Sequence, residues 1–241
     1  MNGNRIKFIA ALTMFIDHMG LLLFPHILLF RYIGRLAMPL YAYLISEGAF
    51  YTRNKLKYFL EIFLMGTFCQ SVYIIEELFS FGIRSVYLNI LLTFSFSLLI
   101  IFPFLKMKEV YNGKGIKKAA PYFLLFILAL SFSVFFEAFS KNSVALTGIS
   151  VKTDYGLMGI LLPFSAAIFK DKFKKLLSFS LALVIFNIYL MPNLPYTWFS
   201  LAVIPLLLLY NGKRGKKAYK YAFYLFYPLH LAFLYLIAAA V

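Results

Sequence analysis

Nine apolar stretches fill the sequence almost from end to end. Most are about 17 to 22 residues long, the length that a helix needs to cross a hydrocarbon core of about 30 Å. They cover residues 6–24, 33–51, 56–76, 86–105, 119–138, 154–169, 175–191, 196–210 and 219–240, of which the sixth and eighth are the shortest. Because backbone polar groups must be satisfied inside a bilayer, the sequence predicts an all-α polytopic membrane protein with about nine transmembrane helices in a single bundle.

Lysine and arginine gather in every second connection between these stretches. The basic segments are the N-terminus, 52–57, 106–118, 170–175 and 211–220, and they hold most of the 24 basic residues. Cytoplasmic segments accumulate such residues, so we expect the N-terminus inside and the C-terminus outside. No long polar linker and no small-residue cleavage site interrupts the pattern. We therefore expect one domain over residues 1–241, with the first stretch retained as a helix.

The net charge and the hydrophobic composition together indicate which class of partner the protein binds. A net charge of +15 could indicate nucleic acid, but 63% of the residues are hydrophobic and the cations lie between apolar stretches, where they act as topology signals and lipid headgroup contacts. We expect a lipid bilayer as the partner and no nucleic acid. The single cysteine, Cys69, excludes a disulfide framework, and no metal-ligand pattern or soluble-enzyme fingerprint is present. Any functional site must be built from the helices.

The first stretch carries two adjacent ionisable residues, Asp17 and His18, in "MFIDHMG". An ionisable side chain at this depth costs about 2.5 to 3.5 kcal/mol or more, and is retained when it is paired, hydrated or functional. His18 lies about 18 Å along the helix axis, slightly beyond the membrane midplane. Consecutive helix residues do not face one partner. We therefore expect Asp17 to pair with an arginine of the next helix, while His18 faces elsewhere.

That arginine is found in "RYIGRLAMPLYAYLISEG". Arg31 and Arg35 are four residues apart and share one helix face, and Gly34 allows close approach of another helix. Arg31 is either an interfacial arginine or a binding residue, and Arg35 is predicted to pair or to bind a ligand. Pro39 predicts a bend. Glu47 is either a charge at the membrane rim or a binding residue.

The last stretch contributes "YAFYLFYPLHL", where Tyr227 and His230 are three residues apart and Pro228 releases a backbone carbonyl. His230 is informative because the chain has only three histidines. Before this stretch, "YNGKRG" contains Lys213 and Arg214. These cations either reflect topology alone or form an anion site for a phosphate-bearing cytosolic ligand.

In order and spacing, "MFIDHMG", "RYIGRLAMPLYAYLISEG" with "YTRN", "LLLYNGKRG" and "YLFYPLHL" resemble the TraX family of membrane proteins. The member that gives the family its name is associated with N-terminal acetylation of pilin. The family is in turn distantly similar to larger membrane acyltransferases, which take acetyl-CoA from the cytosol and acylate an acceptor across the membrane. By this resemblance His18 is the buried catalytic histidine and Arg35 is a site arginine.

These observations together predict a bacterial plasma-membrane acetyltransferase that uses acetyl-CoA to modify an amine or hydroxyl of a peptide or cell-surface acceptor. His18 acts as general base or as a transient acetyl carrier, Asp17 holds Arg35, and Arg35 stabilises developing negative charge. The residues expected to bind acetyl-CoA are Arg31, Glu47, Lys213, Arg214, Tyr227 and His230. Two alternatives stay open: a small ion- or proton-coupled transporter, and a non-catalytic membrane assembly factor.

Overall fold

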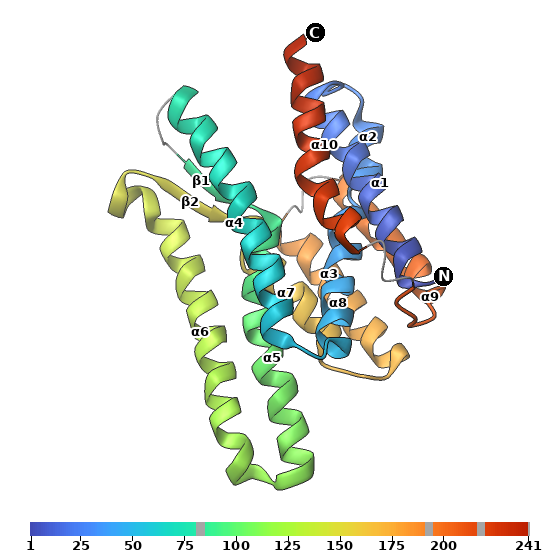
Figure 1. The fold of residues 1–241 in the computed structure, drawn as a ribbon, viewed down its shortest axis with the longest axis vertical. Coiled ribbons are helices and arrows are strands. Elements are labelled where there is room, and N and C mark those ends of the chain that lie inside the picture. The colour runs from blue at the N-terminus through green and yellow to red at the C-terminus, as the bar shows by residue number, and fades with distance from the viewer. Residues whose placement is uncertain (81–84, 191–194, 216–219, 241) are drawn as a thin grey trace. The chain divides into compact units, whose positions relative to one another are not determined.

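The computed structural model describes residues 1–80, 85–190, 195–215 and 220–240 (Figure 1). The described residues are almost entirely helical, so the all-α prediction is confirmed. The chain divides into two compact units, one made of Met1–Leu44 and Asp171–Val241, the other of Ile45–Lys170. The boundary falls within α3 (Ala37–Tyr51). The single polytopic domain stays a prediction.

The first unit centres on α1, which packs against both α2 and α10, so helices from opposite ends of the chain lie side by side (Figure 1). The 3₁₀ helix η1 contacts α2, α8 and α9. Besides the first part of α3, the elements of this unit are α1 (Gly3–Leu22), α2 (Leu28–Gly34), α8 (Lys172–Leu190), η1 (Pro195–Ala202), α9 (Val203–Leu208) and α10 (Lys220–Ala240).

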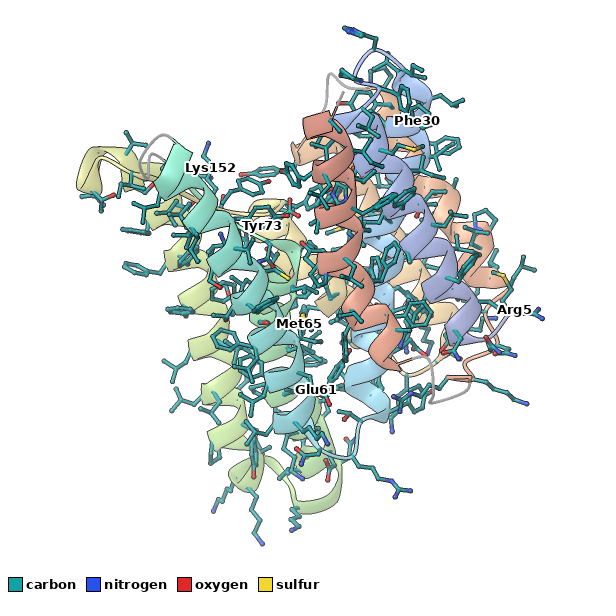
Figure 2. All side chains as sticks on the ribbon, turned by 45° about the horizontal axis from the view of Figure 1, so that its top comes forward. Arg5, Phe30, Glu61, Met65, Tyr73 and Lys152 are labelled. Carbon is teal, nitrogen blue, oxygen red and sulfur yellow. The ribbon has the colours of Figure 1, made fainter. Side chains whose placement is uncertain are left out.

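The N-terminus of α1 is tied to the segment that follows α9. The Asn2 side chain caps α1 by accepting a hydrogen bond from the Arg5 backbone N–H at 3.1 Å. The Gly3 N–H donates to the Lys213 carbonyl at 2.7 Å. The basic N-terminus and the described part of the basic segment 211–220 therefore share one end of this unit, and Phe30 lies at the other end (Figure 2).

The second unit centres on α5, which packs against α4, α6 and α7. Its most buried side chains, Leu98, Ile100 and Ile101, have no exposed surface. The Ser97 hydroxyl donates to the Ile160 carbonyl at 2.7 Å, joining α5 to α7. The elements of this unit are α4 (Lys55–Ser80), β1 (Ser85–Leu88), α5 (Ile90–Lys114), α6 (Ile116–Thr147), β2 (Ser150–Thr153) and α7 (Gly156–Ala167).

Two short strands, which the sequence analysis did not predict, lie at one end of the second unit. β1 and β2 pair in parallel, with Ser85 opposite Ser150. The α5–α6 hairpin forms the crossover between them. On β2, the Val151 carbonyl accepts from the Ser140 hydroxyl at 2.6 Å, and its N–H donates to the Ser143 hydroxyl at 2.9 Å. Serines of α6 thus satisfy backbone groups that a further strand would satisfy.

The basic segments of the second unit gather at the end opposite the strands. The Lys55 ammonium lies 5.8 Å from the centroid of the Phe102 ring, and the Lys108 ammonium donates to the Ile168 carbonyl at 2.8 Å. Lys152 marks the strand end (Figure 2). Within each unit, therefore, the basic segments share one end, as the predicted alternation requires. The inside and outside assignment stays a prediction.

Three helices in the described residues are long and apolar enough to cross a membrane, namely Lys55–Ile75 of α4, α5 and α6. α6 exposes large apolar side chains along its length, including Phe123, Leu128 and Phe135, which suits contact with lipid. These helices make the chain a helical membrane protein. Nine spans remain a prediction, and three further apolar helices of the described residues are shorter, namely Gly156–Ala167, Pro195–Leu208 and Ala222–Ala238.

Two of the differences from the predicted helix boundaries lie at connections between helices. The predicted helix over 33–51 is divided, since α2 ends at Gly34 and α3 begins at Ala37. Pro39 lies in the first turn of α3, where no backbone donor is needed, so the expected bend occurs before Pro39. The predicted loop 106–118 is helical apart from Gly115, whose φ of +80° allows α5 to reverse into α6 within one residue.

Asn89 joins the start of α5 to α4. Its side chain accepts from the backbone N–H groups of Leu91 and Leu92 and donates to the Gly66 carbonyl at 2.8 Å. Replacing it with alanine would leave buried partners unsatisfied, so we expect Asn89→Ala to lower the free energy of unfolding by about 1 to 3 kcal/mol. Thermal unfolding in detergent measures the effect. The control is Asn142→Ala, because Asn142 is exposed and its side-chain amide donates to the Ala138 carbonyl of its own helix; equal melting temperatures for the two variants would contradict this account.

Candidate active site

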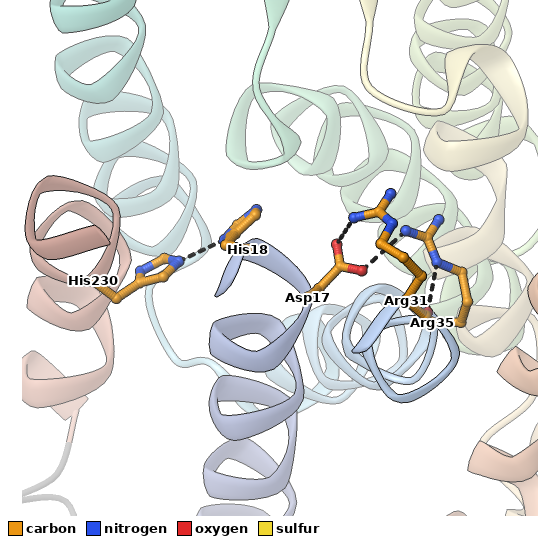
Figure 3. Close-up of polar contacts among 5 residues, drawn as sticks. All are labelled: Asp17, His18, Arg31, Arg35 and His230. Atoms are coloured by element: carbon orange, nitrogen blue, oxygen red, sulfur yellow. Dashed lines mark hydrogen bonds and ion pairs between the residues drawn. The ribbon is translucent and has the colours of Figure 1, made fainter. Parts of the chain in front are cut away.

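An ion cluster joins α1 to α2. The Asp17 carboxylate lies between two guanidinium groups, with Oδ2 at 2.9 Å from Arg31 Nη1 and Oδ1 at 3.1 Å from Arg35 Nη2 (Figure 3). The side chains are 16%, 23% and 9% exposed respectively. Arg35 Nε also donates to the Arg31 carbonyl at 3.4 Å. The prediction that Asp17 pairs with an arginine of the next helix is confirmed, and both arginines take part because their spacing of four residues puts them on one face of α2.

Two glycines allow α1 and α2 to approach closely. A Cβ atom built on Gly34 would lie 2.0 Å from Asp17 Oδ1, and one built on Gly20 would lie 2.3 Å from Phe30 Cβ. Neither distance is possible for real atoms. The absence of a side chain at Gly34 therefore creates the space that the Asp17 carboxylate occupies, as the sequence analysis predicted for a close helix contact.

The Arg35 guanidinium lies beside an aromatic side chain of η1, which belongs to a small aromatic cluster. Its Cζ lies 5.7 Å from the centroid of the Tyr196 ring, a cation–π distance. Tyr32 meets both Tyr196 and Phe199 edge to face, at centroid separations of 5.9 and 6.0 Å. Tyr196 was not predicted as a site residue. No signal distinguished it, because aromatic residues make up 20% of the chain.

On another side of α1, His18 meets His230 of α10. The distance from His18 Nδ1 to His230 Nε2 is 2.8 Å, a hydrogen bond (Figure 3). The ring planes are 22° apart and the centroids 5.0 Å apart, which fits two nearly coplanar rings that meet through their nitrogen atoms. His230 is only 4% exposed. The structure thus brings together two of the histidines that the sequence predicted separately as site residues.

The surroundings of His230 fix its ring. Its Nδ1 lies 2.8 Å from the Phe226 carbonyl oxygen, one helical turn earlier. The Phe226 ring is parallel to it within 5° at a centroid separation of 4.7 Å, and the Tyr227 ring meets it edge to face at 6.0 Å. Tyr227, a predicted site residue, therefore lies beside the histidine pair.

Two of the remaining predicted site residues, Lys213 and Arg214, lie at a distance from the histidine pair within the first unit. Lys213 and Arg214 lie at the N-terminal end of α1, where a Cβ on Gly3 would be 3.0 Å from the Arg214 carbonyl. His18 is 15 residues beyond Gly3, so about 22 Å of helix separates the cations from the histidine pair. Glu47, 6% exposed, belongs to the second unit. Within the first unit, the structure does not group Lys213 and Arg214 with the cluster of His18 and Asp17.

A substitution at Gly34 tests the close contact with Asp17. A methyl group there would displace the carboxylate from both guanidinium groups, so we expect Gly34→Ala to destabilise the protein by about 1 to 3 kcal/mol through overpacking. Gly113→Ala is the matched control, because a Cβ at this helical position meets no atom within 4 Å. Unfolding in detergent should show a lower free energy of unfolding for Gly34→Ala and an unchanged one for Gly113→Ala. An unchanged Gly34→Ala protein would mean that the contact is not as close as described.

Comparison with known proteins agrees with the sequence motifs. A family model described as TraX protein matches residues 2–238. The chain is 26% identical over 252 aligned positions to the probable fimbrial assembly protein FimC, serogroup H1, of Dichelobacter nodosus, and the match covers 95% of this chain and 93% of that protein. No solved structure matches the chain. Since the family match extends over nearly the entire sequence, and the structure adds apolar helices of membrane-spanning length, this protein belongs to the TraX family of membrane proteins.

Proposed function

We propose that this protein is an integral membrane acetyltransferase, which transfers an acetyl group from cytosolic acetyl-CoA to an amine or hydroxyl acceptor at or beyond the membrane. The observation that carries the proposal is the hydrogen-bonded pair of His18 and His230, located one residue from the Asp17 ion cluster. A histidine held by a partner and placed beside fixed cations has the parts that acyl transfer needs, namely a base and a group that stabilises negative charge.

The proposed roles follow from the contacts. His18 removes the proton of the attacking amine or hydroxyl, or carries the acetyl group itself for one step. The Arg35 guanidinium or the Tyr227 hydroxyl stabilises the negative charge that forms on the thioester oxygen. Asp17 is a positioning residue, because it holds both guanidinium groups on one face of α2.

The proposed donor site is the basic end of the first unit. Lys213 and Arg214 lie there with the N-terminus of α1, and fixed cations suit the phosphates of CoA. The extended pantetheine arm would run from these cations toward His18, which lies about 22 Å farther along α1. The bilayer that contains this site would be a bacterial plasma membrane, with the N-terminus inside, and the acceptor would reach the site from the outer side.

A transfer assay tests the proposal. Purified protein in lipid nanodiscs would be incubated with radiolabelled acetyl-CoA and two acceptor panels, peptides with a free N-terminal amine and glycans with free hydroxyls. We expect His18→Ala to lower the transfer rate by about 10² to 10⁴. His26→Ala should retain the wild-type rate, because His26 is exposed in the turn after α1. If folded wild-type protein neither binds CoA nor transfers label, the enzyme proposal is wrong.

A second candidate function is supported by the name of the relative, which describes that protein as a probable fimbrial assembly protein. In this case the protein would promote assembly of a surface fibre without catalysis, and the buried ionisable residues would fix helix packing. The two functions differ for His18→Ala. Fibre assembly in cells that carry folded His18→Ala protein would persist if the role is non-catalytic and would be lost if assembly depends on acetylation.

A further inference from the structure

The hydrogen bonds of His230 determine which nitrogen of His18 carries a proton. A carbonyl oxygen can only accept, so Nδ1 of His230 must donate to the Phe226 carbonyl. In a neutral imidazole the other nitrogen is then an acceptor. Nε2 of His230 therefore accepts from Nδ1–H of His18. It follows that Nε2 of His18 carries no proton, and none of the described residues forms a hydrogen bond with it.

We propose that His230 is the positioning residue of His18: it holds the His18 ring in the Nδ1–H tautomer, with the basic Nε2 presented to the acceptor, and it shares the proton that Nε2 takes up. The kinetic part of this inference rests on the proposed acetyltransferase function. The tautomer itself does not, since it follows from the two hydrogen bonds alone.

The ring of His230 cannot turn over without losing both bonds. A half-turn about its Cβ–Cγ bond would exchange Nδ1 with one ring carbon and Nε2 with the other, and neither the Phe226 carbonyl nor His18 would keep its partner. The parallel Phe226 ring and the edge-on Tyr227 ring oppose such rotation. In proteins, the hydrogen bond made by one ring nitrogen of a histidine commonly decides whether the other nitrogen carries a proton.

In the proposed reaction, each proton and each bond that forms or breaks is accounted for. The acceptor N–H or O–H gives its proton to Nε2 of His18, while its lone pair forms a bond to the thioester carbon. As Nε2 gains that proton, the Nδ1 proton moves toward Nε2 of His230, so the positive charge is shared with the ring farther from Asp17 and its two arginines. When the C–S bond breaks, Nε2 returns a proton to the CoA thiolate, and the pair regains its original tautomers.

Two substitutions at His230 separate positioning from packing. In His230→Asn, the side-chain amide can still donate to the Phe226 carbonyl near the position of Nδ1, but no atom reaches His18. In His230→Gln, the longer side chain can place its amide oxygen near the position of Nε2 and accept from His18. We expect His230→Asn to lower kcat by about 10²-fold with little change in the KM for acetyl-CoA, and His230→Gln to recover much of the loss.

Nitrogen NMR of protein labelled with ¹⁵N-histidine tests the tautomer directly. The chain has three histidines, and exposed His26 supplies an internal reference. We expect His18 to show a protonated Nδ1 and an unprotonated Nε2 in wild type and in His230→Gln, and mixed tautomers in His230→Asn. A His18 ring protonated at Nε2 in the neutral wild-type protein would overturn the inference, as would equal activity of the Asn and Gln variants.

The NMR measurement and the transfer assay test different claims, so each can contradict one claim and leave the other standing. The NMR spectrum does not depend on acetyl transfer, so the predicted tautomer in a protein without transfer activity would refute the proposed function alone. Transfer activity in a protein whose His18 has the opposite tautomer would refute this inference alone.

Discussion

The cost of burying charge governs the first unit. One carboxylate and two guanidinium groups lie largely out of solvent on α1 and α2, and each would be expensive there without the others. The carboxylate lies at ion-pair distance from both guanidinium groups, and this arrangement requires the missing side chain at Gly34 to bring the helices close enough. Removing one member of such a cluster typically costs about 3 to 5 kcal/mol, because it leaves an uncompensated charge behind. The cluster therefore fixes the rotation of α1 against α2.

The sequence predicted those parts of the site that follow from helix periodicity. Asp17 and an arginine of the next helix were expected to meet, and Gly34 was expected at a close contact. The pairing of His18 with His230 was not expected, although both were candidate residues. Periodicity places a residue on a face of its own helix but does not identify the helix opposite, and these two come from the first and last helices of the chain. Tyr196 was missed because it is one of many aromatic residues.

The fold was predictable to a similar depth. Apolar length indicated helices and the basic segments indicated their alternation, and within each unit the basic segments share one end, apart from single cations such as Lys152 and Arg35. The strands β1 and β2 were not predictable, because each has four residues and relies on partners that are distant in sequence. The division between α2 and α3 was also missed. An apolar stretch looks the same whether or not its helix is interrupted, and here Pro39 fits the first turn of a new helix.

The adjacency of Asp17 and His18 has a mechanical consequence. A helix moves as a stiff rod, so a twist of α1 about its long axis swings both side chains together, one across α2 and the other across α10. A ligand that displaces the arginines would therefore also displace the His18–His230 pair, because Asp17 and His18 are joined by a single peptide unit. A displacement at the arginines and proton chemistry at His18 are therefore coupled directly through α1, with no intervening relay of residues.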